Sequence, residues 1–186
     1  MGVLVEEDVA GVLWRTGGET IRVYVAACVE RMAPLFLGVR AVVAEREADR
    51  DLYAQCRRDL WFADRVLTDA ADRIRIVERF PELRPRDEPV TSVADTYAAP
   101  AVLALRHALA ANNSGSARDA VSCGHAVLVA MEMLDQSLGS ELFGQGEYRL
   151  QRLSVSGDIA GLWEASVAVG QERFRAVLGQ IPPGTS

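Results

Sequence analysis

The segment IRVYVAACVERMAPLFLGVRAVVAER, residues Ile21–Arg46, decides the fold class. Its apolar residues recur at steps of three and four, which is the pattern of one helix face. Pro34 lies near the middle and has no amide proton, so it predicts a kink or a break in the turn before it. Because the apolar pattern resumes at once, we expect a kinked helix or two abutting helices, against which the other helices pack.

The same periodicity predicts helices on both sides of this segment. Pro100 predicts a second kink, or alternatively the first residue of a main helix, since proline favours that position. No run of six residues alternates as a strand would. We therefore expect an all-α, single-domain bundle of about six to eight helices with proline-kinked central helices. The predicted helices span residues 4–15, about 49–80 with an optional break at 69–72, 93–109, 117–138, about 147–153, and about 158–178.

Two segments are predicted to be irregular. Residues 81–92, PELRPRDEPVTS, hold three prolines among charged residues and cannot continue a helix. We interpret them as a connection within one domain, 1–186, because each half alone is under 100 residues and would be marginally stable. Residues 179–186 are expected to form a mobile tail.

Composition excludes several classes of function. All 20 cationic side chains are arginine, which excludes a lysine Schiff base or a P-loop lysine. The net charge of −6 disfavours nucleic-acid binding. No apolar run reaches the roughly 20 residues that span a bilayer, and the first residues lack a secretory signal, so we expect a cytoplasmic protein without a membrane partner. The three cysteines, Cys28, Cys56 and Cys123, are predicted to be free and buried.

Four segments resemble one protein family. They are ERMAPLF at 30–36, DLYAQCRRDLW at 51–61, DTYAAPAVLALRHAL at 95–109 and QERFRAVL at 171–178. In this order they are similar to the bacterial helical proteins catalogued as domain of unknown function number 416. The resemblance implies an all-helical fold of six to eight helices and implies no reaction. The chain departs from the family pattern at Pro100, where the family commonly has an aspartate next to an alanine.

The candidate site residues are Glu30, Arg31, Tyr97, His107 and His125. Glu30 and Arg31 precede the break at Pro34. Arg31 is expected either to bind freed carbonyls or to pair with an acidic residue of another helix. Alternatively, Glu30 and Arg31 line a pocket between the two kinks, together with Tyr97 and one of the histidines.

No metal or cofactor is expected. His125, Glu132 and Asp135 lie on one helix, and His107 would have to join them from its neighbour to build a metal site. The spacings H-x-x-x-H and E-x-x-H, which are typical of helical metal sites, do not occur.

Two functions remain open from the sequence. The first is a non-catalytic binding protein, of immunity or accessory type, that acts through a helical surface on a protein partner or on a second copy of itself. The alternative is a small-molecule-binding protein or enzyme that uses the pocket between the kinks. An exposed apolar patch on a tightly packed bundle would favour the first, and a closed polar-lined pocket would favour the second.

Overall fold

A computed structural model describes residues 4–42, 46–62, 69–84, 92–156 and 161–181. Within these ranges the chain forms eight α-helices, one 3₁₀ turn and no strand, which confirms the all-α bundle. None of the helices in these ranges is long and apolar enough to cross a membrane. The elements are α1 (Glu7–Thr16), α2 (Gly18–Val42), α3 (Glu47–Phe62), α4 (Ala70–Val77), the 3₁₀ turn η1 (Pro81–Leu83), α5 (Val93–Ser114), α6 (Ala117–Leu138), α7 (Leu142–Val155) and α8 (Leu162–Leu178).

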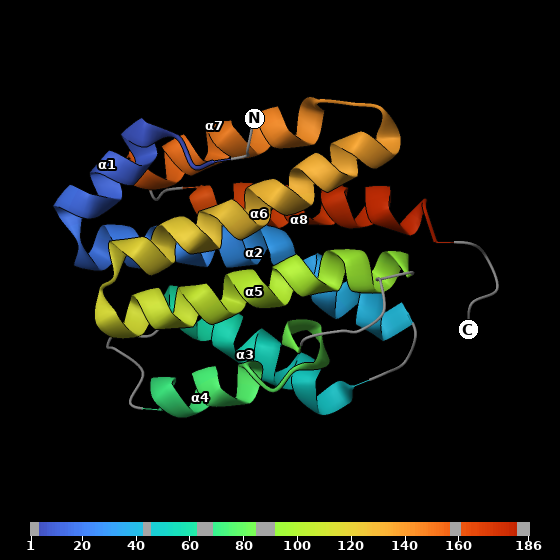
Figure 1. Ribbon diagram of the computed structural model, residues 1–186, viewed down its shortest axis with the longest axis horizontal. Coiled ribbons are helices and arrows are strands. Elements are labelled where there is room, and N and C mark those ends of the chain that lie inside the picture. Colours follow the sequence, from blue (N-terminus) through green and yellow to red (C-terminus); the bar gives the residue numbers. More distant parts are fainter. Residues whose placement is uncertain (1–3, 43–45, 63–68, 85–91, 157–160, 182–186) are drawn as a thin grey trace.

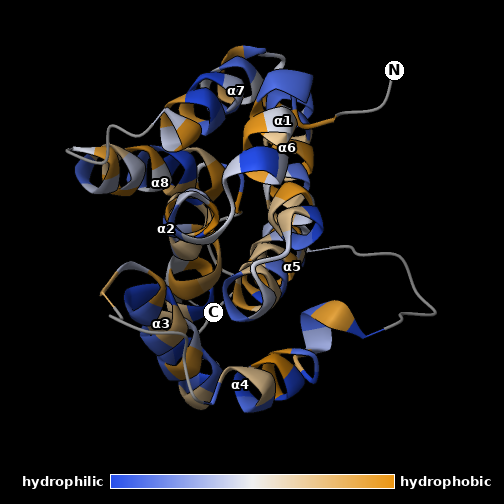
Figure 2. Cartoon of the chain, turned by 90° about the vertical axis from the view of Figure 1, so that its left-hand side faces the viewer, coloured by the Kyte–Doolittle hydropathy of each residue, from blue (hydrophilic) through white to orange (hydrophobic). Residues whose placement is uncertain are grey.

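Helix α2 lies at the centre of the bundle, as expected for the segment that decides the fold. It packs against α3, α5, α6, α7 and α8. Figure 2, which looks along α2, shows these helices around it. In Figure 1, α5 and α6 run side by side in front of α2, while α1 and α7 lie on one side and α3 and α4 on the other. Every residue from Val23 to Ala33 is buried, so α2 has no solvent face there.

Helix α2 continues through Pro34, so the expectation of two abutting helices is wrong. Pro34 removes the hydrogen bond that the Glu30 carbonyl would accept. Gly170 of α8 lies against this place: a β-carbon there would be 3.1 Å from the Glu30 carbonyl oxygen and 3.2 Å from the Pro34 ring. The missing side chain lets the α8 backbone approach the freed carbonyl closely.

Helix α5 also runs through its proline. It begins at Val93, and the Ser92 hydroxyl accepts a hydrogen bond from the Asp95 amide, 2.9 Å away. Serine is a favoured residue at this capping position, and the alternative start at Pro100 is wrong. The predicted segment 49–80 is two helices, α3 and α4. Asp69 has non-helical backbone angles and α4 begins at Ala70, so residue 69 alone of the predicted break 69–72 is non-helical; residues 63–68 lie outside the described ranges.

The C-terminal third differs most from the prediction. Helix α7 spans 14 residues, twice the predicted length, because Asp135 of α6 caps it from outside: its carboxylate accepts from the Phe143 and Gly144 amides, at 3.1 and 2.7 Å. Helix α8 begins at Leu162, later than predicted. Ile181 packs against the core, so the predicted tail starts too early; residues 182–186 lie outside the described ranges, as do 85–91 of the predicted connection.

Candidate functional site

Arg31 forms an ion pair in the centre of the bundle. Its Nε and Nη2 atoms donate to the two carboxylate oxygens of Glu147 on α7, at 3.0 and 2.8 Å. Arg173 of α8 donates from Nη2 to the same carboxylate at 2.6 Å. All three side chains are at most 1% exposed. One carboxylate therefore holds two guanidinium groups that come from different helices.

Neutral polar groups complete this buried cluster. The Gln151 amide donates to Glu147 at 2.9 Å and to the Gly124 carbonyl at 3.0 Å. The Tyr24 hydroxyl donates to the Gln151 side-chain oxygen at 2.9 Å. The cluster thus ties α2, α6, α7 and α8 together, and a dry interior makes each of these bonds costly to break.

Glu147 stays ionised in this setting. Burial alone would raise the pKa of its carboxyl, but the charges and hydrogen bonds of Arg31 and Arg173 prevail and hold the pKa at about 2. The structure thus shows the second of the roles expected for Arg31, pairing with an acid of another helix. Sequence reasoning did not single out Glu147 or Arg173. A charged residue on the buried stripe of each helix was the signal, because a buried charge needs a partner of opposite sign.

Glu30 faces a different helix from Arg31. Its carboxylate accepts from Trp61 Nε1 at 3.1 Å and from Arg57 Nη1 at 3.3 Å, both on α3. Burial raises the pKa of Glu30, while Arg57 and hydrogen bonds from the indoles of Trp61 and Trp163 act to lower it. Glu30 and Arg31 are adjacent in the sequence, but their side chains therefore make contacts with different helices.

Of the other predicted site residues, Tyr97 and His107 have partners of their own and His125 has none among the described residues. The Tyr97 hydroxyl lies 3.2 Å from the Ser137 hydroxyl. His107 Nδ1 lies 3.3 Å from an Asp119 oxygen, and burial lowers the pKa of this histidine. His125 is half-buried and its Nδ1 has no partner among the described residues. The structure does not join these three side chains to Glu30 and Arg31 through any hydrogen bond of the described residues.

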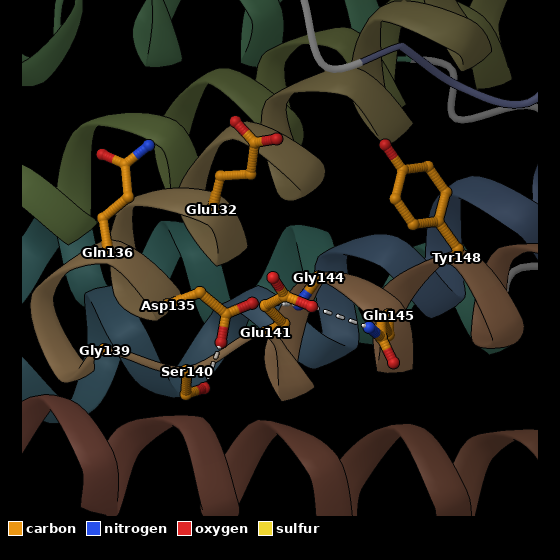
Figure 3. A pocket seen from close by; sticks show the side chains of 9 residues that line it. All are labelled: Glu132, Asp135, Gln136, Gly139, Ser140, Glu141, Gly144, Gln145 and Tyr148. Atoms are coloured by element: carbon orange, nitrogen blue, oxygen red, sulfur yellow. Dashed lines mark hydrogen bonds between the residues drawn. The ribbon is translucent and has the colours of Figure 1, made fainter. Parts of the chain in front are cut away.

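Two open hollows flank the C-terminal part of α6. Each measures about 440 Å³, and neither is lined by Pro34 or Pro100. Figure 3 shows the first, between α6 and α7, with carboxylates and amides at its rim. Its Asp135 is committed to the start of α7, since its oxygens accept from backbone amides and from the Ser140 hydroxyl. The second hollow includes Tyr97 and is lined by uncharged side chains.

The aromatic surface, defined here as Trp61, Phe62 and Trp163, lies where α3 ends and α8 begins. Phe62 and Trp163 are 66% and 42% exposed, and their rings meet edge to face with centroids 6.2 Å apart. Beneath them Trp61 packs on a small apolar cluster that is separate from the main core and consists of Val23, Ala27 and Leu162.

This surface is held from below by Glu30. Its hydrogen bond with the Trp61 indole fixes one of the three rings on the central helix. Large exposed aromatic side chains that are fixed in place are typical of binding surfaces. Of the predicted residues, only Glu30 belongs to this region. Sequence reasoning assigned both tryptophans to core or interface packing, because a helical pattern cannot tell a covered stripe from an uncovered one.

Comparison with protein-family models, characterised proteins and solved structures found no match. The resemblance carried by ERMAPLF and the three other segments therefore stays a prediction. The candidate site rests on geometry alone, and the aromatic surface is the part of the described structure that most resembles a place for a partner.

Proposed function

We propose that this protein works by binding, without catalysis, and that the aromatic surface is where it contacts a protein partner in the cytoplasm. The observation that carries the proposal is the exposed Phe62–Trp163 pair above a buried, hydrogen-bonded carboxylate. This is the exposed apolar patch on a packed bundle that favours the first of the two functions left open by the sequence.

The energetics of burial support this choice. Complete burial of a phenylalanine side chain contributes roughly 1.5–3 kcal/mol of free energy. Because Phe62 and Trp163 are still exposed to water, a partner that covers them would gain a large part of this free energy on binding. The hydrogen bond between Glu30 and the Trp61 indole reduces the freedom that binding would have to remove. Aromatic anchors of this kind dominate the affinity of many protein interfaces.

The alternative of a small-molecule pocket between the two proline positions lacks a supporting observation. Pro34 packs on Gly170 of α8, and the two hollows described above lie along α6 instead. Four of the polar residues expected to line that pocket, Glu30, Arg31, Tyr97 and His107, bind separate partners. The family resemblance, if correct, agrees with either function, since it implies no reaction.

Site-directed photo-crosslinking tests the proposal. A photoreactive phenylalanine analogue placed at Phe62 should capture one protein species in lysate of the source, and mass spectrometry should identify it. The matched control places the same analogue at Trp14 of α1, which is 65% exposed and outside the aromatic surface. Capture from position 62 alone supports the proposal, while equal capture from both positions shows non-specific contact.

Affinity then tests the role of the rings. The purified partner should bind the Phe62→Ala, Trp163→Ala variant at least about 30-fold more weakly than wild type, which corresponds to about 2 kcal/mol. Trp14→Ala should leave the affinity unchanged. An unaltered affinity of the double variant in calorimetry, with intact helix content, would remove the aromatic surface from the interface.

A further inference from the structure

Two opposite charges flank the aromatic surface. Arg58 precedes Phe62 by one helical turn on α3, and Glu164 follows Trp163 on α8. Both side chains are exposed, and neither forms an ion pair with another described residue. Two other arginines of α3 and α4 do have partners: Arg57 binds Glu30, and Arg73 of α4 binds Asp59.

This arrangement is complementary to itself. In a two-fold dimer both copies use the same surface. If residue i of the first copy contacts residue j of the second, then residue j of the first copy contacts residue i of the second. An axis through the Phe62–Trp163 pair stacks aromatic rings on aromatic rings. It also brings the α3 side of one copy, with Arg58, towards the α8 side of the other, with Glu164. The same rotation therefore buries the rings and pairs both charges.

We propose that the partner of the aromatic surface is a second copy of this chain, in a two-fold dimer in which Arg58 of each copy pairs with Glu164 of the partner subunit. This inference rests on the proposed function, because it names the occupant of the same surface. The rings supply the affinity. The charges fix the orientation, since exposed ion pairs contribute only about 0.2–1 kcal/mol each.

The first measurement is the concentration dependence of mass in sedimentation velocity, from about 1 to 200 μM. Wild type should show a reversible monomer–dimer equilibrium, and Phe62→Ala, Trp163→Ala should remain monomeric across this range. Trp14→Ala should dimerise as wild type does. Circular dichroism of each variant shows that the helices are retained.

Charge reversal provides the decisive test. Arg58→Glu and Glu164→Arg should each weaken self-association, because each places like charges opposite one another in both contacts. An equimolar mixture of the two variants should dimerise again. In the mixed dimer one contact has Glu at 58 facing Arg at 164, and the other has the original pair. Arg75→Glu on α4, which lies in an exposed pair with Asp72, is the control and should leave dimerisation unchanged.

Three results would overturn the dimer: a monomeric wild type at 200 μM, a dimer that survives the loss of both rings, or a mixture that associates no better than its components. None of them contradicts the proposed function by itself. If position 62 then crosslinks to a different protein, the surface binds a heterologous partner. If it crosslinks to nothing, the proposed function fails as well.

Discussion

Glu147 carries the one negative charge that lies between two buried guanidinium groups. Taking charges out of water is costly, and the cost is offset here only while all three groups remain together. The guanidinium group of Arg173 is only partly hydrogen-bonded, because its Nε and Nη1 have no partner among the described residues. Burial lowers the pKa of this arginine. The cluster is therefore sensitive to the loss of the carboxylate charge.

Replacement of Glu147 by glutamine should destabilise the protein by about 3–5 kcal/mol, the usual cost of removing one partner of a buried pair. Glutamine keeps the size of the side chain but leaves Arg31 and Arg173 without a counter-charge. Urea unfolding followed by circular dichroism measures the change. Glu172→Gln, an exposed change on α8, should alter the free energy of unfolding by less than about 0.5 kcal/mol. Equal stability of the two variants would contradict this account of the cluster.

The same carboxylate should make the protein acid-sensitive. Its pKa falls from an ordinary 4.5 to about 2 in the folded state, so the folded state binds the proton less tightly than the unfolded state does. The resulting stability is fully present above pH 4.5 and is lost as the pH falls towards 2. Its size is roughly 3 kcal/mol.

Unfolding free energies of wild type and Glu147→Gln, compared at several values between pH 2 and 6, test this dependence. Other carboxylates titrate in both proteins, so the difference between the two curves isolates Glu147. That difference should shrink as the pH falls below 4.5. A constant difference would mean that Glu147 has the same pKa in the folded and unfolded protein.

Between helices, glycines decide how closely the elements approach. Gly124 of α6 lies directly against Tyr24 of α2: a β-carbon at this position would overlap the Tyr24 hydroxyl and come within 3.1 Å of the Gln151 oxygen. This is the close helix approach that explains a glycine inside α6. At Gly38 a β-carbon would come within 2.6 Å of the Phe174 ring, so α8 also approaches α2 at a glycine.

Gly124→Ala should therefore destabilise the protein by about 1–3 kcal/mol, despite the better helix propensity of alanine. The cost should be smaller in a Tyr24→Phe background, because the overlapping hydroxyl is absent. A double-mutant cycle by thermal or urea unfolding measures this coupling. Gly146→Ala on α7 is the matched control: no atom lies within 4 Å of its β-carbon, so it should stabilise by up to about 1 kcal/mol. Additive effects of the two substitutions would contradict the overlap.

Across the whole molecule, α2 connects two groups of helices. Its first half reaches α7 and α8 through the ion cluster. Its second half reaches α3 and the residue before η1 through Phe36, whose ring stacks on Tyr53 of α3 at 4.9 Å and on Phe80 at 5.8 Å. The two halves use different chemistry, polar in one and aromatic in the other, so a local change should not affect both equally.

Hydrogen exchange followed by mass spectrometry can reveal this division. Glu147→Gln should raise exchange most in α7 and α8, which lose their common carboxylate, and least in α4. Arg75→Ala, which removes an exposed pair on α4, should change exchange nowhere beyond its own helix. A uniform rise across all helices in Glu147→Gln would show that the bundle opens only as one unit.

Local rules anticipated much of the fold. The serines at 92 and 116 cap α5 and α6, and such a cap can be predicted locally because it needs only its own side chain and the next turn. Helix α7 was predicted too short, since its cap, Asp135, comes from another helix and no local pattern announces it. The candidate site was anticipated only in part: Glu30 was named, Trp163 was assigned to core or interface packing, and Phe62 was not singled out.

By itself, the sequence determined the helical class, the central position of the helix that contains Ile21 and Pro34, and the starts of α5 and α6, because apolar periodicity and capping act within a few residues. The tertiary structure decided which way each buried polar group faces. Helix α2 is buried all round from Val23 to Ala33, so its pattern has no solvent face from which to orient Glu30 and Arg31. The two residues differ only in their tertiary partners. Glu30 binds Trp61 and supports the aromatic surface, whereas Arg31 binds Glu147 in the centre of the core.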